Sequence, residues 1–144
     1  MPIIEWNDTY LTGISQIDEH HRHLVGLFNQ TYLQFIKYAS PDELSIVFDE
    51  LIDYATYHFA AEEQLMQESN YPERVSHKQA HDEFIRRVLE MHTDYCSKRK
   101  SPFLEILAFL QNWLAAHILQ SDAAFGRFLA VPLKNSPGDT GVKK

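Results

Sequence analysis

The stretch that decides the fold is residues 54–81, YATYHFAAEEQLMQESNYPERVSHKQAH. It places two pairs of polar residues four positions apart, His58 with Glu62 and His77 with His81. Residues four apart in an α-helix differ by only about 40° around its axis, so each pair lies on one face. Apolar residues recur around both pairs at intervals of three and four, which is the period of an amphipathic helix. The stretch therefore predicts two helices with polar pairs on their apolar faces.

The rest of the chain extends this pattern to four helices. The first is predicted from about residue 17 to 38, the second from Ser40-Pro41-Asp42-Glu43, the third after Asn70-Tyr71-Pro72 and the fourth from Ser101-Pro102. Short loops make neighbouring helices antiparallel, so we expect an all-α, up-down-up-down four-helix bundle. The predicted inward stripes are Ile17, His21, Leu24, Phe28, Tyr32 and Phe35; Val47, Leu51, Tyr54, His58, Glu62 and Leu65; His77, His81, Phe84, Val88, Met91 and Tyr95; and Ile106, Leu110, Trp113 and His117.

The length of 144 residues corresponds to one domain, which we place at residues 1–130. Residues 1–16 have no helical period and are expected to form an irregular arm on that domain. Residues 131–144 contain several prolines and glycines and few apolar side chains, so we expect a poorly ordered tail.

Composition excludes several classes of partner and location for this protein. The formal net charge of −7 disfavours nucleic acid and anionic membranes as partners. The most apolar run, residues 103–119, is too short and too polar to span a bilayer, and the N-terminus does not resemble a signal peptide. The single cysteine, Cys96, excludes a disulfide within the chain. We therefore expect a cytoplasmic protein.

Histidines on the apolar faces are the strongest chemical signal. Burying a carboxylate and several imidazoles costs several kcal/mol unless each finds a partner. One such histidine is usually a satisfied core residue, but here all four predicted helices carry one. A metal ion that accepts both imidazole and carboxylate removes the penalty for all of them at once. The pattern therefore favours a metal site inside the bundle.

Asp122 leaves two alternatives open. It lies five residues after His117, and a regular helix would turn it roughly 140° away from that histidine. Either Asp122 is a surface residue, or the helix widens there. A π-type bulge between Ala116 and Asp122 would bring both groups to one side, and such bulges favour functional sites.

The spaced polar residues resemble the signature of the hemerythrin family, H, HxxxE, HxxxH and HxxxxD. The segments that carry the resemblance are Asp18-Glu19-His20-His21, His58-Phe59-Ala60-Ala61-Glu62, His77-Lys78-Gln79-Ala80-His81 and Trp113-Leu114-Ala115-Ala116-His117-Ile118-Leu119-Gln120-Ser121-Asp122. The match runs from about Trp6 to Asp122 and is most similar to the bacterial branch of the family. It implies that Asp122 is a metal ligand.

The resemblance also implies the cofactor and the roles of the residues. The cofactor would be two iron ions, bridged by carboxylates and by an oxo or hydroxo group, that bind dioxygen reversibly for transport, storage or delivery. One iron would be held by His77, His81 and His117, the other by His21 and His58, with Glu62 and Asp122 bridging. Five histidines divide unequally, so one coordination position stays open at the two-histidine iron. Apolar side chains should keep water away from that position, and we expect this dry wall to consist of Leu24, Phe59, Trp113, Leu114 and Ile118.

Five further residues are not predicted to bind the metal. His20 and His23 lie about 100° and 200° around the helix from His21, so we expect them at the surface or rim. His92 is some 16 Å along the axis from His81, too far to share a metal. Cys96 is expected to be a buried or partly buried thiol, and Tyr54 to pack in the core rather than support the site.

Three alternative functions remain. A ferritin-like di-iron oxidase or peroxidase would use Glu-x-x-His pairs, which this sequence lacks, so we predict no enzyme beyond weak peroxidase activity. An oxygen or redox sensor would need an output domain or an oxygen-dependent partner. Handling of iron or nitric oxide would use the same ligands. An oxygen-consuming protein is the partner that a carrier would serve.

Overall fold

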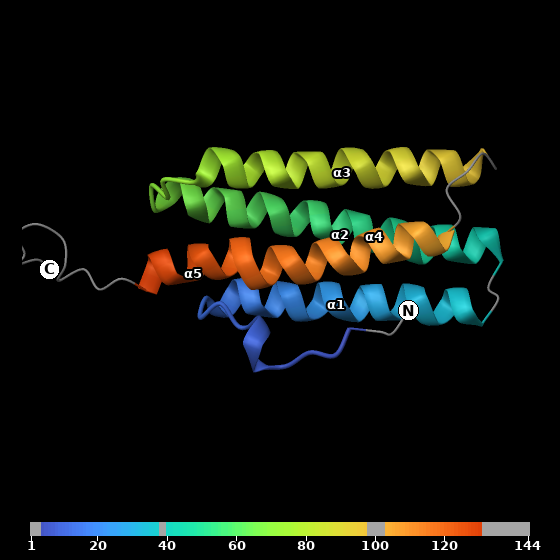
Figure 1. The fold of residues 1–144 in the computed structure, drawn as a ribbon, viewed down its shortest axis with the longest axis horizontal. Helices are drawn as coiled ribbons and strands as arrows, with labels where there is room; N and C mark the ends of the chain where they lie inside the picture. Colours follow the sequence, from blue (N-terminus) through green and yellow to red (C-terminus); the bar gives the residue numbers. More distant parts are fainter. Residues whose placement is uncertain (1–3, 38–39, 98–102, 131–144) are drawn as a thin grey trace, which may run out of the picture.

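The computed structural model describes residues 4–37, 40–97 and 103–130, and all regular structure in these ranges is helical. The main helices are α1 (Ser15–Ile36), α2 (Pro41–Glu68), α3 (Arg74–Cys96), α4 (Phe103–Ala116) and α5 (Ala123–Ala130). Between α4 and α5 the chain continues through a π-helical segment, η2 (His117–Asp122). The last three elements form one rod (Figure 1), so four rods make up the bundle and the all-α prediction is confirmed.

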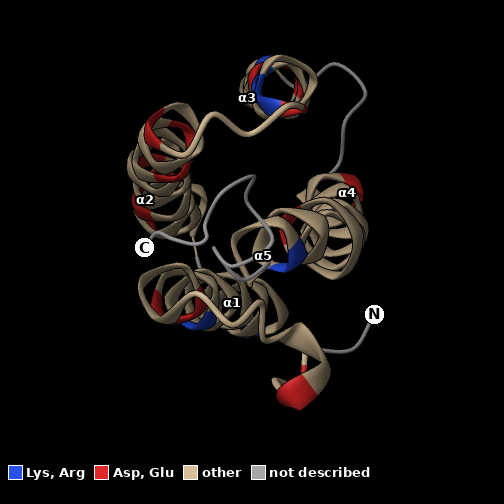
Figure 2. Ribbon diagram, turned by 90° about the vertical axis from the view of Figure 1, so that its left-hand side faces the viewer, with Lys and Arg blue, Asp and Glu red and all other residues tan. Residues whose placement is uncertain are grey.

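An end-on view places the four rods at the corners of the bundle (Figure 2). The rod α2 lies between α1 and α3, and the rod of α4 and α5 closes the fourth side. None of the described helices is long and apolar enough to cross a membrane.

The start of α2 follows the predicted cap. The Ser40 hydroxyl oxygen accepts a bond from the Glu43 backbone N–H at 3.1 Å, and the Glu43 carboxylate accepts one from the Ser40 N–H at 2.8 Å. Pro41 occupies the first helical turn, where its missing N–H is harmless. The cap predicted at 101–102 and the tail predicted at 131–144 lie outside the described residues.

The buried face of α2 differs from the predicted stripe. Phe48 and Met66 are completely buried, whereas Val47 and Leu65 are only half-buried. The reason is that α2 packs against both α1 and α3. A helix between two neighbours buries a wider arc than one apolar stripe, and the strict spacing selected only part of that arc.

Two apolar clusters fill the bundle, one on each side of its polar residues. The larger contains Leu24, Phe59, Phe84 and Leu114, and the smaller contains Met66, Tyr71 and Phe125. On α2 and on the rod of α4 and α5 the predicted histidines fall between members of the two clusters in chain order. On α1 and α3 they fall between the larger cluster and residues just before the helix, Ile14 and Tyr71, which belong to the smaller one. The polar residues therefore form one layer that is sealed by hydrocarbon above and below.

The N-terminal segment is pinned to the bundle by side-chain bonds. Asn29 exchanges two hydrogen bonds with the backbone of Ile4, at 2.8 and 2.9 Å. Asp18 accepts bonds from the Thr12 backbone N–H at 2.7 Å and from the Thr12 hydroxyl at 2.8 Å. Close to Thr12, Gly126 of α5 allows the two backbones to approach, because a Cβ there would collide with the Thr12 carbonyl oxygen.

Substituting Gly126→Ala should therefore destabilise the protein by about 1–3 kcal/mol, since the added methyl must push the Thr12 backbone away. Urea unfolding followed by circular dichroism measures the loss. The matched control is Gly26→Ala in α1, where a Cβ meets nothing within 4 Å. That substitution should stabilise the helix by about 0.5–1 kcal/mol. Equal effects of the two substitutions would contradict the close-contact interpretation.

Candidate metal centre

The π-helical segment η2 decides where Asp122 points. A π-turn holds one more residue than an α-turn, so a side chain five positions after His117 returns to the same side. The His117 Nε2 atom lies 3.2 Å from Asp122 Oδ1, and both side chains are buried. Of the two arrangements that the spacing left open, the structure contains the bulge.

A group of three histidines forms one half of the polar layer. Single donor atoms of Glu62, His77, His81, His117 and Asp122 all lie within 4.8 Å of one another. His77 Nε2 is 3.1 Å from Glu62 Oε1 and 2.9 Å from Asp122 Oδ1. The Nε2 atoms of His81 and His117 are 3.1 Å apart. All five side chains are buried, although His77 also lines a surface pocket between α3 and the segment η2.

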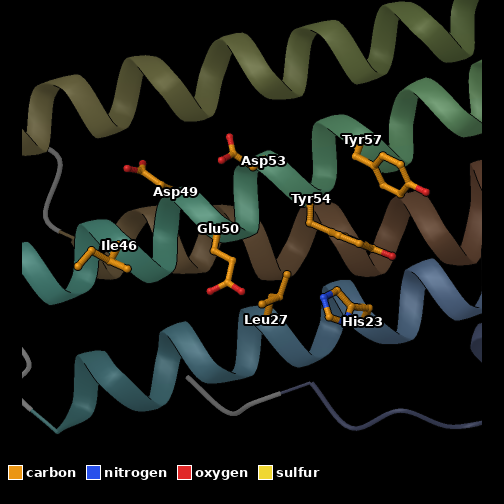
Figure 3. Close-up of a pocket in the computed structure, with 8 residues that line it drawn as sticks. All are labelled: His23, Leu27, Ile46, Asp49, Glu50, Asp53, Tyr54 and Tyr57. Atoms are coloured by element: carbon orange, nitrogen blue, oxygen red, sulfur yellow. The ribbon is translucent and has the colours of Figure 1, made fainter.

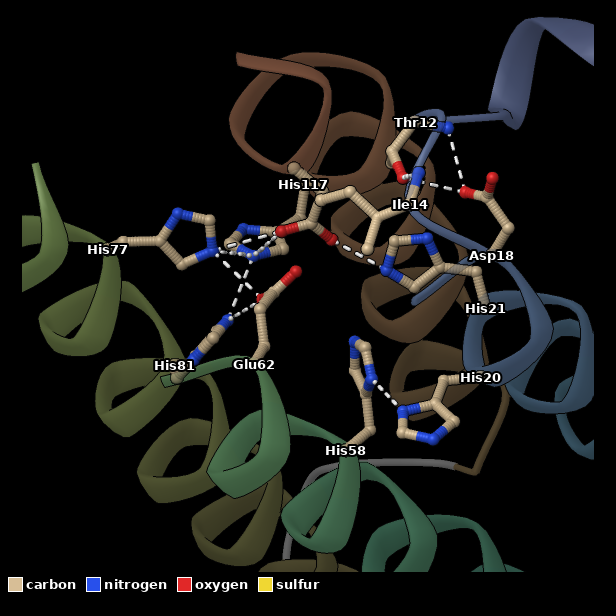
Figure 4. A network of polar contacts seen from close by, with 11 residues as sticks. Thr12, Ile14, Asp18, His20, His21, His58, Glu62, His77, His81 and His117 are labelled. Atoms are coloured by element: carbon tan, nitrogen blue, oxygen red, sulfur yellow. Dashed lines mark hydrogen bonds and ion pairs between the residues drawn. The ribbon is translucent and has the colours of Figure 1, made fainter. Parts of the chain in front are cut away.

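A group of two histidines forms the other half. Donor atoms of His21, His58, Glu62 and Asp122 likewise lie within 4.8 Å of one another. His21 Nε2 is 2.8 Å from Asp122 Oδ2, the second oxygen of the same carboxylate. Both halves therefore contain Glu62 and Asp122, and Figure 4 shows Glu62 between the two sets of imidazoles.

Several buried donor atoms of this layer have no hydrogen-bond partner within the described part of the chain. They are His58 Nε2, Glu62 Oε2, both nitrogens of His21 and both carboxylate oxygens of Asp122. His21 and Asp122 approach to ion-pair distance without hydrogen-bond geometry. Such atoms are costly to bury, and divalent cations, which accept imidazole and carboxylate ligands, would engage one nitrogen of each histidine and the carboxylate oxygens. The residues present therefore fit a metal site.

Burial and neighbouring charges shift the pKa values of the side chains in this layer. Burial lowers the pKa of His58 to about 2, helped by the neighbouring His21, so His58 is neutral. Burial alone would also lower the pKa of His77, but the nearby carboxylates of Asp122 and Glu62 outweigh it and raise that pKa to about 9. Burial opposes ionisation of Asp122, yet His117 beside it holds its pKa well below the ordinary value. In the metal-free chain a proton on His77 thus supplies the positive charge between the carboxylates.

Comparison with known proteins agrees with this geometry. A model described as "Hemerythrin HHE cation binding domain" matches residues 12–129. The chain belongs to the hemerythrin family. Curated bacteriohemerythrins from Stenotrophomonas maltophilia and Pseudomonas aeruginosa are 33% and 35% identical to it, each over 87% of this chain and 80% of the relative. A bacteriohemerythrin from Clostridium acetobutylicum is 30% identical, over 83% of this chain and 96% of its own length.

The fold agrees as well. A crystal structure titled wild-type hemerythrin superposes with a TM-score of 0.77 at 23% identity, and the match covers 88% of this chain and 97% of that chain. The resemblance seen in the spaced histidines is therefore confirmed at the level of family and fold. Within this hemerythrin, the cluster of histidine, glutamate and aspartate side chains is able to bind metal.

Two residues outside the predicted seven contact the centre. Glu63 places a carboxylate oxygen 2.7 Å from His81 Nδ1. His20 places its Nδ1 atom 2.9 Å from His58 Nδ1, and the pair is buried. The expectation that His20 lies at the surface or rim was wrong, because the seam between α1 and α2 covers the face to which it points. Glu63 was missed, and its only signal was its place next to Glu62.

His23, His92 and Cys96 lie outside the polar layer. His23 is exposed, as expected, and its ring packs on Tyr54 at 4.3 Å between centroids. His92 stacks on Phe48 at 4.3 Å, away from the seven polar residues. Cys96 is exposed, which corrects the expectation of a buried thiol, because it is the last residue of α3.

The apolar residues expected around the site divide into two aromatic rings that stack on histidines and three buried aliphatic side chains. Phe59 stacks on His81 with 3.9 Å between ring centroids, and Trp113 stacks on His117 at 4.2 Å, so both contact the three-histidine group. Leu24, Leu114 and Ile118 are 1–2% exposed. Hydrocarbon therefore surrounds the layer, although Trp113 is only half-buried.

A surface groove lies between α1 and α2 without reaching the polar layer (Figure 3). It is lined by His23, Leu27, Ile46, Asp49, Glu50, Asp53, Tyr54 and Tyr57. None of the seven clustered residues is among these. The rings of Tyr54 and Tyr57 stand 5.8 and 5.4 Å from that of His20, which makes His20 the link between this surface and the centre.

The charge on His77 predicts a pH dependence of the metal-free protein. The folded pKa of about 9 exceeds the ordinary value of 6.5, so the folded state holds the extra proton between these limits. That stabilisation is complete below pH 6.5 and is lost as the pH rises to 9, with a slope of at most about 1.4 kcal/mol per pH unit. Urea unfolding in chelator at pH 6–9 measures it.

The variant His77→Gln should remove this slope, because no proton is gained there on folding. The low pKa of His58 acts below pH 6.5 and leaves this window unchanged. A wild-type slope that persists in His77→Gln would show that another group carries the proton.

Proposed function

We propose that this hemerythrin holds two iron ions in its polar layer and binds dioxygen reversibly, as a carrier, store or deliverer rather than as an enzyme. The observation that carries the proposal is the sharing of both carboxylates between the two donor groups. A cation in the two-histidine group would engage His21 Nε2, His58 Nε2 and the unpartnered oxygens of Glu62 and Asp122. A second cation in the other group would account for the convergence of three imidazoles, in which His117 Nε2 lies 3.1 Å from the Nε2 atoms of both His77 and His81.

In this proposal the ligand roles follow the two groups. His77, His81 and His117 would hold one iron, His21 and His58 would hold the other, and Glu62 and Asp122 would be shared by both. The two-histidine half would then have one protein ligand fewer than the other, so dioxygen is expected to bind there.

When bound, the two irons supply a reversible exchange of two electrons with dioxygen. The residues of the chain supply the conditions for reversal. Neutral His58 presents a lone pair without needing to lose a proton. The carboxylates offset most of the metal charge, so a layer with little net charge can stay in an apolar bundle. The aromatic rings on His81 and His117 restrict water and fix those imidazoles in place.

The direct test is iron content followed by cycling between gases. The purified protein should contain two irons per chain, and its reduced form should change its visible spectrum in air and recover it under nitrogen over many cycles. Irreversible oxidation at the first contact with air would contradict the proposal, as would fast, saturable turnover of hydrogen peroxide with a reductant. Cytoplasmic location and an oxygen-consuming protein partner stay predictions from the sequence.

Opening the dry wall should shorten the life of the oxygenated state. Leu24→Ala removes a side chain that is 1% exposed and lies one turn from His21, so water should reach the centre and autoxidation should speed several-fold. The decay of the visible spectrum in air measures the rate. The matched control is Leu107→Ala, an equally buried leucine ten residues, or about 15 Å along the helix, before His117.

Both substitutions should destabilise the fold by about 2–5 kcal/mol, because each leaves a cavity. Only Leu24→Ala should alter autoxidation. Equal rates in the two variants would remove Leu24 from the wall and attribute any change to general loosening of the bundle.

A further inference from the structure

His20 and His58 form a contact that the seven-residue signature does not contain. Their Nδ1 atoms are 2.9 Å apart, and His20 is only 7% exposed. Figure 4 shows the two rings meeting through these atoms, with His58 standing beside Glu62 and His20 on the outer side. The contact therefore connects a residue of the two-histidine group to the seam between α1 and α2.

A hydrogen bond between two imidazole nitrogens needs one donor and one acceptor. If His58 donates its Nδ1–H, the Nε2 atom carries the lone pair, and that atom is the unpartnered one inside the cluster. If His20 donates instead, His58 carries a buried Nε2–H without an acceptor, which is costly and blocks a metal. In the first arrangement both nitrogens of His58 have a partner once a cation is present.

We propose that His20 is a positioning residue that accepts the His58 Nδ1–H bond and so holds His58 Nε2 ready for the metal of the two-histidine half. This rests on the proposed function. The equivalent device in the other half is the Glu63 carboxylate, 2.7 Å from His81 Nδ1. Partners on the second nitrogen commonly orient histidine ligands and tune metal affinity.

The two-histidine half depends on this contact more than the other half does. Its second histidine, His21, has an Nδ1 atom without a partner in the described part of the chain. His58 is therefore the one histidine of that half whose ring is oriented by a bond at Nδ1. His20 itself is held in place, because the rings of Tyr54 and Tyr57 stand 5.8 and 5.4 Å from its own.

The first experiment reads the tautomer directly. Nitrogen-15 NMR of histidine-labelled, metal-free protein should show the proton of His58 on Nδ1, hydrogen-bonded to His20. In His20→Leu, which is similar in size but has no acceptor, His58 should become a mixture of tautomers. In His20→Gln, whose amide oxygen can accept, the Nδ1–H form should return. A wild-type proton on His58 Nε2 would overturn the proposal.

The second experiment titrates the same proteins with zinc, a diamagnetic ion that takes the same ligands. His20→Leu should weaken one of two zinc equivalents by about 10–100-fold, with shifts at His21 and His58, and leave the other unchanged. His20→Gln should recover most of the loss. His23→Leu, an exposed histidine on the same helix, should bind like wild type.

The outcomes separate the two proposals. Equal zinc affinity in His20→Leu and wild type, or equal losses in His20→Leu, His20→Gln and His23→Leu, would refute the positioning role of His20 even if the iron protein binds dioxygen. A wild-type protein without iron would refute the proposed function, while the tautomer measured in the metal-free chain still decides whether His58 donates to His20. If His20→Leu does not fold, the nitrogen-15 spectrum of the wild-type protein and the zinc affinity of His20→Gln still test the proposal.

Discussion

The burial of seven ionisable side chains in one layer is the constraint on which the rest of the structure depends. Five imidazoles and two carboxylates lie where a bundle of this size would otherwise place hydrocarbon. Removing such groups from water costs several kcal/mol each unless charge and hydrogen bonding compensate. In the metal-free chain the compensation is partial: His77 carries a proton between the carboxylates, while atoms of His21, His58 and Glu62 are left without partners. Metal binding in the layer would give these atoms partners.

The backbone is adapted to this layer as well. A regular α-helix through His117 would carry Asp122 to another face, and the bundle would then lose the second of its two shared carboxylates. The π-helical segment corrects the angle at the expense of regular hydrogen bonding. Apolar clusters on both sides hold the rod in place despite this local irregularity. The irregular segment is therefore positioned by packing, and the packing is what allows the donor atoms to converge.

The sequence predicted what depends on period and local chemistry. Spacing of three and four identified the four rods, the capping residues identified the start of α2, and the HxxxE and HxxxH pairs identified faces that do converge. Spacing alone could not choose between the two positions of Asp122, since that choice depends on a change of helix type, and only the resemblance to hemerythrins favoured the ligand position. The sequence also misplaced His20. Its spacing gives the angle of about 100° between His20 and His21 around the helix, but it does not show which neighbouring helix covers that direction. The buried arc of α2 was missed for the same reason, whereas Cys96 is exposed because α3 ends there.

The two halves of the layer differ in how the chain supports them, and this difference follows from where each lies. The three-histidine half faces α3 and the rod of α4 and α5, and it has a carboxylate on His81 and aromatic rings on His81 and His117. The two-histidine half lies against the seam of α1 and α2 and has a neutral imidazole, His20, as its outer contact. A carboxylate binds an imidazole N–H more strongly than a neutral nitrogen does. The three-histidine half is thus also the more firmly held, and the two-histidine half is the one whose imidazoles are freer to adjust.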